Sequence, residues 1–445
     1  RLVMRDDRNL NLSTAQVTAF ALPAAGLATL LFFVQFFFLK YGTEVLLIPP
    51  AIVGALLAGA KIWDAVSDPL IGSLSDRSTS ARGRRHPWMW WSLPVMGLGF
   101  VLIWAIPVEA SVTIKAGFTL AALLIFYTGF TLHSVPHVSF GAELTSNSHQ
   151  RVRAFGARHI FWTLGLFASF AFVQISSGQT QSQVLYLSVG IAAGALLICA
   201  STPMFLKPRP APPSTKQANF VRDYKSVLSQ RGAVILIAVW FIENLGAGVL
   251  GGLAPFYADY VIERPDLVGA LPATYALCGV ITIPLWVQAS RWFGKKNTWM
   301  FAMILGAFGF ALTYASSVSL IVLFIALGLA GAAMGCGGVM AIAVMADLVD
   351  RLESQTGARR EGAFTALLNF GLKTGIALAT ALGGLMLGWV GFAAKEVQSP
   401  DTVEGIQIFF AVFPALGFLI GVIVFWRFPE ENEGHEPRVL TEQTA

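Results

Sequence analysis

Residues 46–74 read LLIPPAIVGALLAGAKIWDAVSDPLIGSL, and this stretch decides what kind of fold the chain can have. It is long and apolar enough to cross the roughly 30 Å hydrocarbon core of a bilayer as a helix. It nevertheless contains Lys61, Asp64 and Asp68, which lie at i, i+3 and i+7 and therefore project from one stripe of the predicted helix. Charged side chains at this depth face protein or water and are candidates for function.

The composition of the whole chain is that of a protein built for lipid. Of its 445 residues, 55% are hydrophobic and only 12% are charged, about half the charged fraction of a soluble domain. Apolar runs of about 20 residues recur along the chain and lack the alternation of a spanning strand. An all-α membrane protein is therefore predicted. Its twelve spans are expected near residues 16–39, 46–74, 88–106, 114–142, 155–176, 184–206, 233–260, 267–289, 298–316, 319–347, 361–391 and 406–427.

The distribution of Lys and Arg predicts the orientation. If both termini lie in the cytoplasm, the cytoplasmic segments hold 23 of the 30 Lys and Arg residues, and the opposite loops hold only Lys40, Lys115, Arg264 and Lys395. This is the positive-inside pattern, and it accounts for the pI near 9.2 without nucleic-acid binding. We expect a multi-pass protein of a bacterial inner membrane. The first apolar run lacks a small-residue cleavage site, so a retained helix is expected there.

A proline-rich, basic segment divides the chain into two halves. It reads KPRPAPPSTKQANFVRDYKSVLSQRG from Lys207 and is too polar to enter lipid. Halves of this kind place the substrate site near the bilayer midplane. The predicted parts are an N-terminal six-helix bundle with the cation site (1–206), a cytoplasmic linker (207–232), a C-terminal six-helix bundle (233–430) and a cytoplasmic tail (431–445).

Paired carboxylates are the most informative charges inside the predicted spans. A charged side chain at mid-membrane costs about 2.5–3.5 kcal/mol even on the mildest scale. Asp64 and Asp68 lie one turn apart and form an anionic oxygen site suited to a small alkali cation or a shared proton. Thr131 and Ser134 in span four would add neutral oxygens. The alternatives are that Lys61 merely neutralises one aspartate and that the hydroxyls bond back to their own helix.

Further polar groups inside the spans suggest substrate binding or gating. Arg158 in span five and Glu243 in span seven lie in opposite halves, so an ion pair between them would be a gate, or alternatively a static pair that guides assembly. Lys373 in span eleven has no acid in its own helix, so its partner must be a substrate group or a span-two carboxylate. Two histidines four residues apart resemble a metal pair but lack a third ligand. The candidates for substrate binding or gating are therefore Arg158, Glu243, Lys373, His133, His137 and Lys61.

Several motifs, in this order, resemble the glycoside-pentoside-hexuronide:cation symporters of the major facilitator superfamily. They are KIWDAVSDPLIG from Lys61, the basic loop ending RGRRHPW, SVPHVSFGAELT from Ser134 followed by RVRAFGAR, MADLVDRLESQTGARREG from Met345, and Lys373 in span eleven. The resemblance covers nearly the whole chain. It implies the major facilitator fold, with two pseudo-symmetric six-helix bundles, and sodium- or proton-coupled symport. It also implies that Asp64 and Asp68 hold the cation, with Thr131 as a helper.

The resemblance points to two kinds of substrate. In the melibiose branch of the family, three side chains that hold the sugar correspond here to Ala28, Ser134 and Val138, which cannot make the same contacts. The sodium-dependent lysophosphatidylcholine symporters resemble the chain at Arg158 and Glu243. We therefore expect a lysophospholipid-like charged amphiphile as substrate. A sugar or glycoside is the alternative, and an uncoupled lipid flippase is a further one.

The remaining expectations concern partners and chemistry. Sodium or a proton is the expected coupling ion, with no other cofactor, and sodium would bind at Asp64 and Asp68. No nucleophile motif or phosphate loop is present in the sequence, so enzymatic activity is not expected. The expected partners are the transported solute and membrane lipid, with no nucleic acid, and the chain is expected to act as a monomer.

Overall fold

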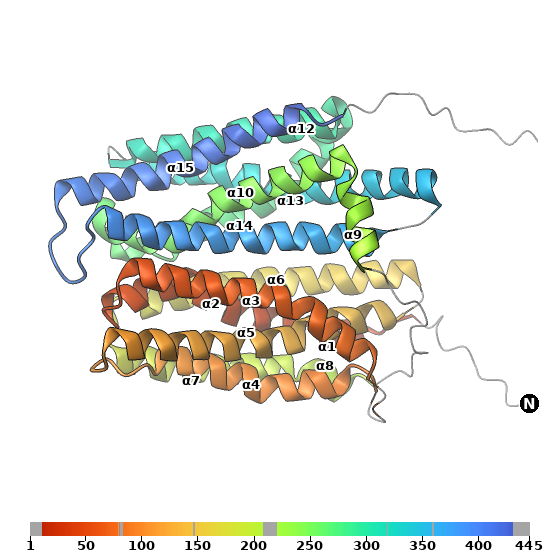
Figure 1. Ribbon diagram of the computed structural model, residues 1–445, viewed down its shortest axis with the longest axis horizontal. Coiled ribbons are helices and arrows are strands. Elements are labelled where there is room, and N and C mark those ends of the chain that lie inside the picture. Colours follow the sequence, from red (N-terminus) through yellow and green to blue (C-terminus); the bar gives the residue numbers. More distant parts are fainter. Residues whose placement is uncertain are drawn as a thin grey trace, which may run out of the picture.

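The computed structural model describes residues 11–78, 80, 83–145, 147–207, 220–317, 319–357 and 360–429. This part of the chain is helical and contains no strand. Backbone groups in lipid must find their hydrogen bonds within their own segment, and long apolar helices achieve this. Figure 1 shows these helices lying side by side in two groups, one coloured red to yellow and the other green to blue.

The first group is formed by the N-terminal part of the chain. α1 and α2 together make one span. They are two helices and not one because Pro23 lacks the N–H that would continue the helical hydrogen bonds. The group consists of α1 (Thr14–Ala21), α2 (Pro23–Glu44), α3 (Pro50–Asp76), α4 (His86–Trp104), α5 (Val112–Glu143), α6 (Ser148–Ser176), α7 (Gln181–Cys199) and α8 (Ser201–Phe205).

The second group follows a short helix that lies inside the predicted linker. This helix, α9 (Phe220–Leu228), is held to the residue before α14 by an ion pair of 3.1 Å between Asp223 Oδ1 and Arg360 Nε. The group consists of α10 (Arg231–Phe256), η2 (Tyr257–Val261), η3 (Pro265–Leu267), α11 (Ala270–Ile281), α12 (Ile283–Leu312), η4 (Thr313–Ser317), α13 (Leu320–Thr356), α14 (Glu361–Trp389) and α15 (Pro400–Trp426).

Eleven helices of the described chain are long and apolar enough to span a membrane, whereas the sequence predicts twelve spans. The difference lies at Gly294, whose φ of 75° and ψ of 157° interrupt α12. The rings of Trp286 and Phe301 lie 6.3 Å apart, although fifteen residues of one straight helix would separate them by about 22 Å. The chain therefore reverses at Gly294. α11 with the first part of α12 corresponds to predicted span eight, and the rest of α12 to span nine.

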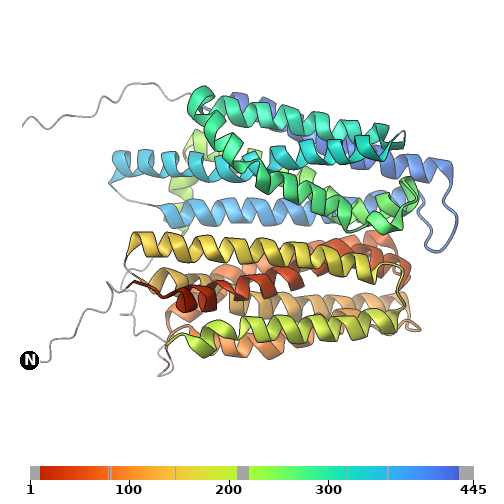
Figure 2. The ribbon, with the colours of Figure 1, turned by 180° about the vertical axis from the view of Figure 1, so that it is seen from behind.

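The two bundles meet along a seam in which α3 packs against α14. Glycine allows these helices to approach closely, since a Cβ at Gly384 would lie 2.3 Å from the carbonyl oxygen of Pro50. The views from both sides place the first described residues, α9 and the end of α15 at one end of the molecule (Figures 1 and 2), which we call the terminal face. The other end, which we call the opposite face, is formed by loops 45–49, 105–111, 262–269 and 390–399.

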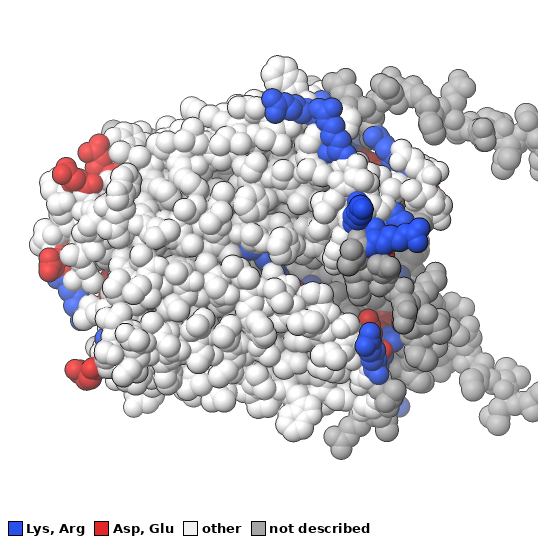
Figure 3. Space-filling view, in the orientation of Figure 1, with Lys and Arg blue, Asp and Glu red and all other residues white. Residues whose placement is uncertain are grey.

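Charged side chains gather at these two faces. Figure 3 shows Lys, Arg, Asp and Glu mostly at the two ends of the molecule, and the broad band between them is white apart from small blue patches near its middle. Large apolar side chains are exposed along the spans, among them Trp91, Phe301 and Ile321. An apolar surface of this extent is one that lipid covers. The chain is therefore a multi-span membrane protein.

Candidate functional site

The two aspartates of α3 meet Lys373 of α14 in the seam between the bundles. Lys373 Nζ lies 2.8 Å from Asp64 Oδ2 and 2.5 Å from Asp68 Oδ2. All three residues lie in the interior of their helices, far from the ends. Lys373 therefore joins the two bundles at membrane depth. The sequence left open whether Lys373 pairs with a substrate group or with the carboxylates of span two. In this conformation it pairs with the carboxylates.

Hydroxyl groups complete the polar surroundings of Asp64. Thr131 Oγ1 donates a hydrogen bond of 3.2 Å to Asp64 Oδ1. Ser67 Oγ lies 3.1 Å from the Asp64 carbonyl oxygen and 3.2 Å from Thr131 Oγ1. Ser134, predicted as a further ligand, makes no hydrogen bond to either aspartate in the described structure. The second hydroxyl comes instead from Ser67, whose i+3 spacing from Asp64 was the signal that sequence reasoning missed.

The exposure of the three charged side chains shows on which side the site opens. The side chain of Asp64 is 2% exposed, whereas those of Asp68 and Lys373 are 32% and 22% exposed. Asp68 lies one turn nearer to Asp76, the end of α3 at the terminal face. The site is therefore reached from the side of Asp68 and is closed behind Asp64. Two carboxylates with neighbouring hydroxyls are a donor set that fits a small alkali cation or a proton.

Lys61 is buried beside this site, but it does not form the ion pair with an aspartate that the sequence left open as an alternative. Its ammonium lies 4.9 Å from the centroid of the Tyr127 ring, a cation–π contact. It is within electrostatic reach of Asp64, Asp68 and Lys373. Two ammonium groups thus accompany two carboxylates, and the cluster has no net charge when all four side chains are ionised.

Arg158 and Glu243 do not pair with each other in this conformation, so the predicted ion pair is absent. The Arg158 guanidinium lies 5.8 Å from the ring centroid of Trp162, within α6. Glu243 Oε1 accepts a hydrogen bond of 2.9 Å from Trp299 Nε1 of α12. Each side chain therefore makes its contact within its own bundle. Arg158 Nε and Glu243 Oε2 have no hydrogen-bond partner.

The two histidines of α5 are fully buried inside the first bundle. His133 Nδ1 lies 2.9 Å from Ser92 Oγ, and His137 Nε2 lies 2.8 Å from the Phe20 carbonyl oxygen. Both imidazoles are within electrostatic reach of Arg158. The two histidines therefore connect α5 to α4 and α1 within the first bundle, and in the described structure neither forms a hydrogen bond with the two aspartates.

A second polar connection between the bundles lies at the opposite face. Lys40 of α2 pairs with Asp259 of η2 and, at 3.0 Å, with Glu44 Oε2, and Tyr260 Oη donates a hydrogen bond of 3.0 Å to Glu44 Oε1. Lys40 is almost fully buried. The sequence pattern does not predict this connection between the bundles. The available signal was that Lys40 and Asp259 end the first span of each half.

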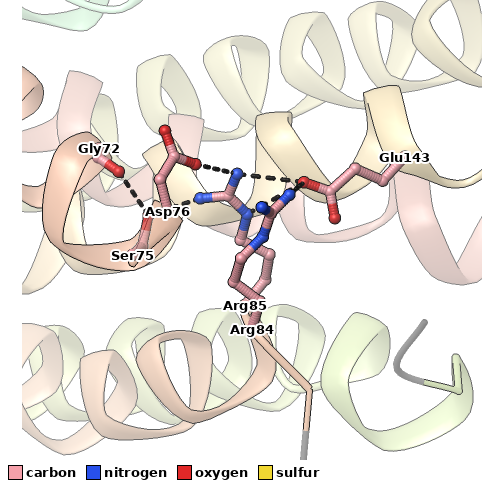
Figure 4. Close-up of polar contacts among 6 residues, drawn as sticks. All are labelled: Gly72, Ser75, Asp76, Arg84, Arg85 and Glu143. Carbon is pink, nitrogen blue, oxygen red and sulfur yellow. Dashed lines mark hydrogen bonds and ion pairs between the residues drawn. The ribbon is translucent and has the colours of Figure 1, made fainter. Parts of the chain in front are cut away.

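A network at the terminal face fixes α3 against α5. Arg84 and Arg85, from the basic loop after α3, both point at Glu143 at the end of α5 (Figure 4). Arg85 also pairs with Asp76 and donates a hydrogen bond of 2.6 Å to Ser75 Oγ. The network therefore holds the helix of the two aspartates in register with the helix that carries Thr131.

Comparison with known proteins places the chain in a family. Residues 19–432 match the family model described as MFS/sugar transport protein. The inner membrane symporter YicJ of Escherichia coli (strain K12) is 26% identical over 93% of this chain and 90% of that protein. The isoprimeverose transporter of Lactiplantibacillus pentosus is 26% identical over 92% of this chain and 87% of that protein. The glucuronide carrier protein homolog of Escherichia coli (strain K12) is 26% identical over 88% of this chain and 87% of that protein.

A solved structure shares the fold. It is that of a bacterial homolog to the human lysosomal transporter Spinster, with a TM-score of 0.70, 14% identity and coverage of 95% of this chain and 100% of that one. These relatives are named as a symporter, a transporter and a carrier, and the family model likewise describes transport proteins and not enzymes. The chain therefore belongs to the MFS/sugar transport protein family, as a solute transporter with the major facilitator fold.

Proposed function

We propose that this protein couples the entry of a sodium ion or a proton to the uptake of a sugar or glycoside, and that the cation binds at Asp64 and Asp68. The observation that carries the proposal is the bridge from Lys373 to both carboxylates in the seam between the bundles. A cation that takes these carboxylates must displace the ammonium. Cation binding therefore breaks an electrostatic tie between the two bundles.

Electrostatics also gives a reason for coupling. A displaced Lys373 ammonium is a charge at membrane depth without its carboxylate partners, which is unfavourable by several kcal/mol. A substrate in the seam supplies hydroxyl or acidic oxygens to this ammonium. Cation and substrate together complete the site, whereas the cation alone leaves Lys373 unsatisfied. Alternating access then moves both across the membrane.

The proposed substrate is a sugar because two of the relatives are named for sugar transport. These names favour a sugar or glycoside, which is the alternative predicted from the sequence, over the expected lysophospholipid. Arg158 supports a sugar acid as a more specific candidate. Its guanidinium pairs with no carboxylate in the described structure and lies over the Trp162 ring. A sugar carboxylate would give it the bidentate partner that arginine favours.

Uptake into proteoliposomes tests the cation site. For the protein without substitutions, an inward sodium or proton gradient should increase uptake of the transported sugar. Asp64→Asn should abolish this stimulation, whereas Asp401→Asn, at the exposed start of α15, should retain it. Undiminished stimulation in Asp64→Asn would reject the assignment of the cation site.

A thermal-shift screen tests the substrate. Neutral glycosides, glucuronides and lysophosphatidylcholine would be compared with and without sodium. A sugar should stabilise the protein, and a glucuronide should lose its effect in Arg158→Ala more than a neutral glycoside does. Stabilisation by lysophosphatidylcholine and by none of the sugars would overturn the proposal. Uptake that does not depend on any ion gradient would indicate a flippase.

A further inference from the structure

Glu243 is a carboxyl group for which the cycle above has no use. It lies on α10 and is completely buried inside the second bundle. Within the described chain, no Lys, Arg or His side chain forms an ion pair with it. Its Oε1 accepts the Trp299 indole hydrogen bond of 2.9 Å, and its Oε2 has no partner at all.

The packing around Glu243 Oε2 is tight. A Cβ placed on Gly337 of α13 would lie 2.5 Å from this oxygen, so a larger residue there would have to displace the carboxyl group. The titratable groups within electrostatic reach are Tyr275 of α11 and Cys336 of α13, and neither can carry a positive charge. α14, α15 and α2 also pack against α10, and in the described residues none of them places a charged side chain that acts on the carboxyl.

These surroundings suit a neutral carboxylic acid and do not suit a carboxylate. A buried ionised carboxylate without a partner is unfavourable by several kcal/mol. A neutral acid has one carbonyl oxygen that accepts hydrogen bonds and one hydroxyl. The Trp299 indole N–H satisfies the carbonyl oxygen of such an acid. We propose that Glu243 is a proton-binding site of the second bundle, separate from the cation site, and that it holds its proton in the conformation described here.

The position of Glu243 suggests what its proton does in the transport cycle. α10 packs directly against α14, the helix that carries Lys373. A rearrangement of these helices that admits water to Glu243 would let the proton leave. A proton would then be a second ligand of the carrier in addition to the cation. This last step rests on the proposed function, whereas the proton site itself does not.

Infrared spectroscopy of the purified full chain tests the site directly. A neutral carboxyl group has a C=O stretch that is well separated from the carboxylate bands. The difference between wild type and Glu243→Gln at neutral pH should contain one neutral-acid band and no carboxylate band. Glu404→Gln, at an exposed position of α15, is the matched control and should remove carboxylate bands only. Loss of carboxylate bands in Glu243→Gln would overturn the proposal.

A second variant keeps the test decisive if Glu243→Gln does not fold. Trp299→Phe removes the indole N–H but retains an aromatic ring. The neutral-acid band should then move to higher frequency, because the carbonyl oxygen loses its hydrogen bond. A spectrum without a shifted neutral-acid band would contradict the proposal. These spectra do not depend on transport, so a failure of the cation or sugar assignment leaves their outcome unaffected.

Discussion

At the scale of single residues, the proposed function makes Lys373 a competitor of the cation for Asp64 and Asp68, with which it forms ion pairs. We predict that Lys373→Ala strengthens sodium binding by roughly tenfold, which corresponds to about 1.4 kcal/mol, and abolishes coupled uptake. Sodium-dependent thermal stabilisation of the purified protein measures the first effect. Lys395→Ala, in an exposed loop of the opposite face, should change neither property. Weaker sodium binding in Lys373→Ala would show that the ammonium supports the site.

The hydroxyl of Thr131 gives a second prediction at this scale. Thr131→Val keeps the shape of the buried side chain but removes the hydrogen bond to Asp64, which is worth about 1 kcal/mol. Sodium affinity should fall by roughly fivefold. Ser134→Ala serves as the control and should leave the sodium titration unchanged. The opposite ranking of the two variants would restore Ser134 as the ligand.

Which of these residues could be predicted follows from the physics of lipid. Asp64, Asp68 and Lys373 were identifiable because a bilayer penalises charge wherever it lies within a span. The penalty says nothing about partners. The predicted Arg158–Glu243 pair is absent in this conformation, in which each side chain contacts an aromatic residue of its own bundle.

At the scale of helices, α4 and α5 pack backbone against backbone through glycine. A Cβ at Gly129 would lie 2.3 Å from the Met96 nitrogen. Gly129→Ala should therefore destabilise the protein by about 1–3 kcal/mol. Gly117→Ala, on the same helix but with no atom within 4 Å of the added carbon, should be neutral or slightly stabilising. Thermal unfolding followed by tryptophan fluorescence compares the two, and equal midpoints would contradict this account of the packing.

The positions of the helices could be predicted because a helix that spans lipid needs a long run of apolar side chains, which hydropathy measures. The predicted spans correspond to helices throughout the described chain, and the exceptions have local causes. The reversal at Gly294 depends on one residue with positive φ inside a continuous helical stretch. α9 depends on docking beside α14 through Asp223 and Arg360, which a hydropathy pattern does not contain.

At the scale of the whole molecule, the Lys40–Asp259 pair closes the opposite face by joining the bundles. Asp259→Asn should shift the population toward a conformation open on that face, by roughly tenfold for a loss of about 1.4 kcal/mol. Distances between spin labels at Glu109→Cys and Glu396→Cys, in a background without the native cysteines, would report this opening as a longer distance.

The control for this opening is Asp266→Asn. Asp266 pairs with Arg264 at 2.7 Å inside one exposed loop of the same face, and this guanidinium lowers the pKa of the Asp266 carboxyl. The pair does not cross between bundles. Its loss should leave the label distances unchanged. Equal shifts for both variants would mean that the loop and not the Lys40–Asp259 pair keeps this face closed.

The balance of two ammonium groups and two carboxylates in the seam has an electrical consequence. An empty carrier with this cluster moves no net charge when it reorients, whereas a carrier loaded with one monovalent cation moves one. The membrane potential contributes about 2.3 kcal/mol per elementary charge per 100 mV. Voltage would therefore drive the inward step of a neutral sugar and leave the return step unaffected. A sugar acid would cancel the charge of the cation, so that its inward step would not depend on the membrane potential.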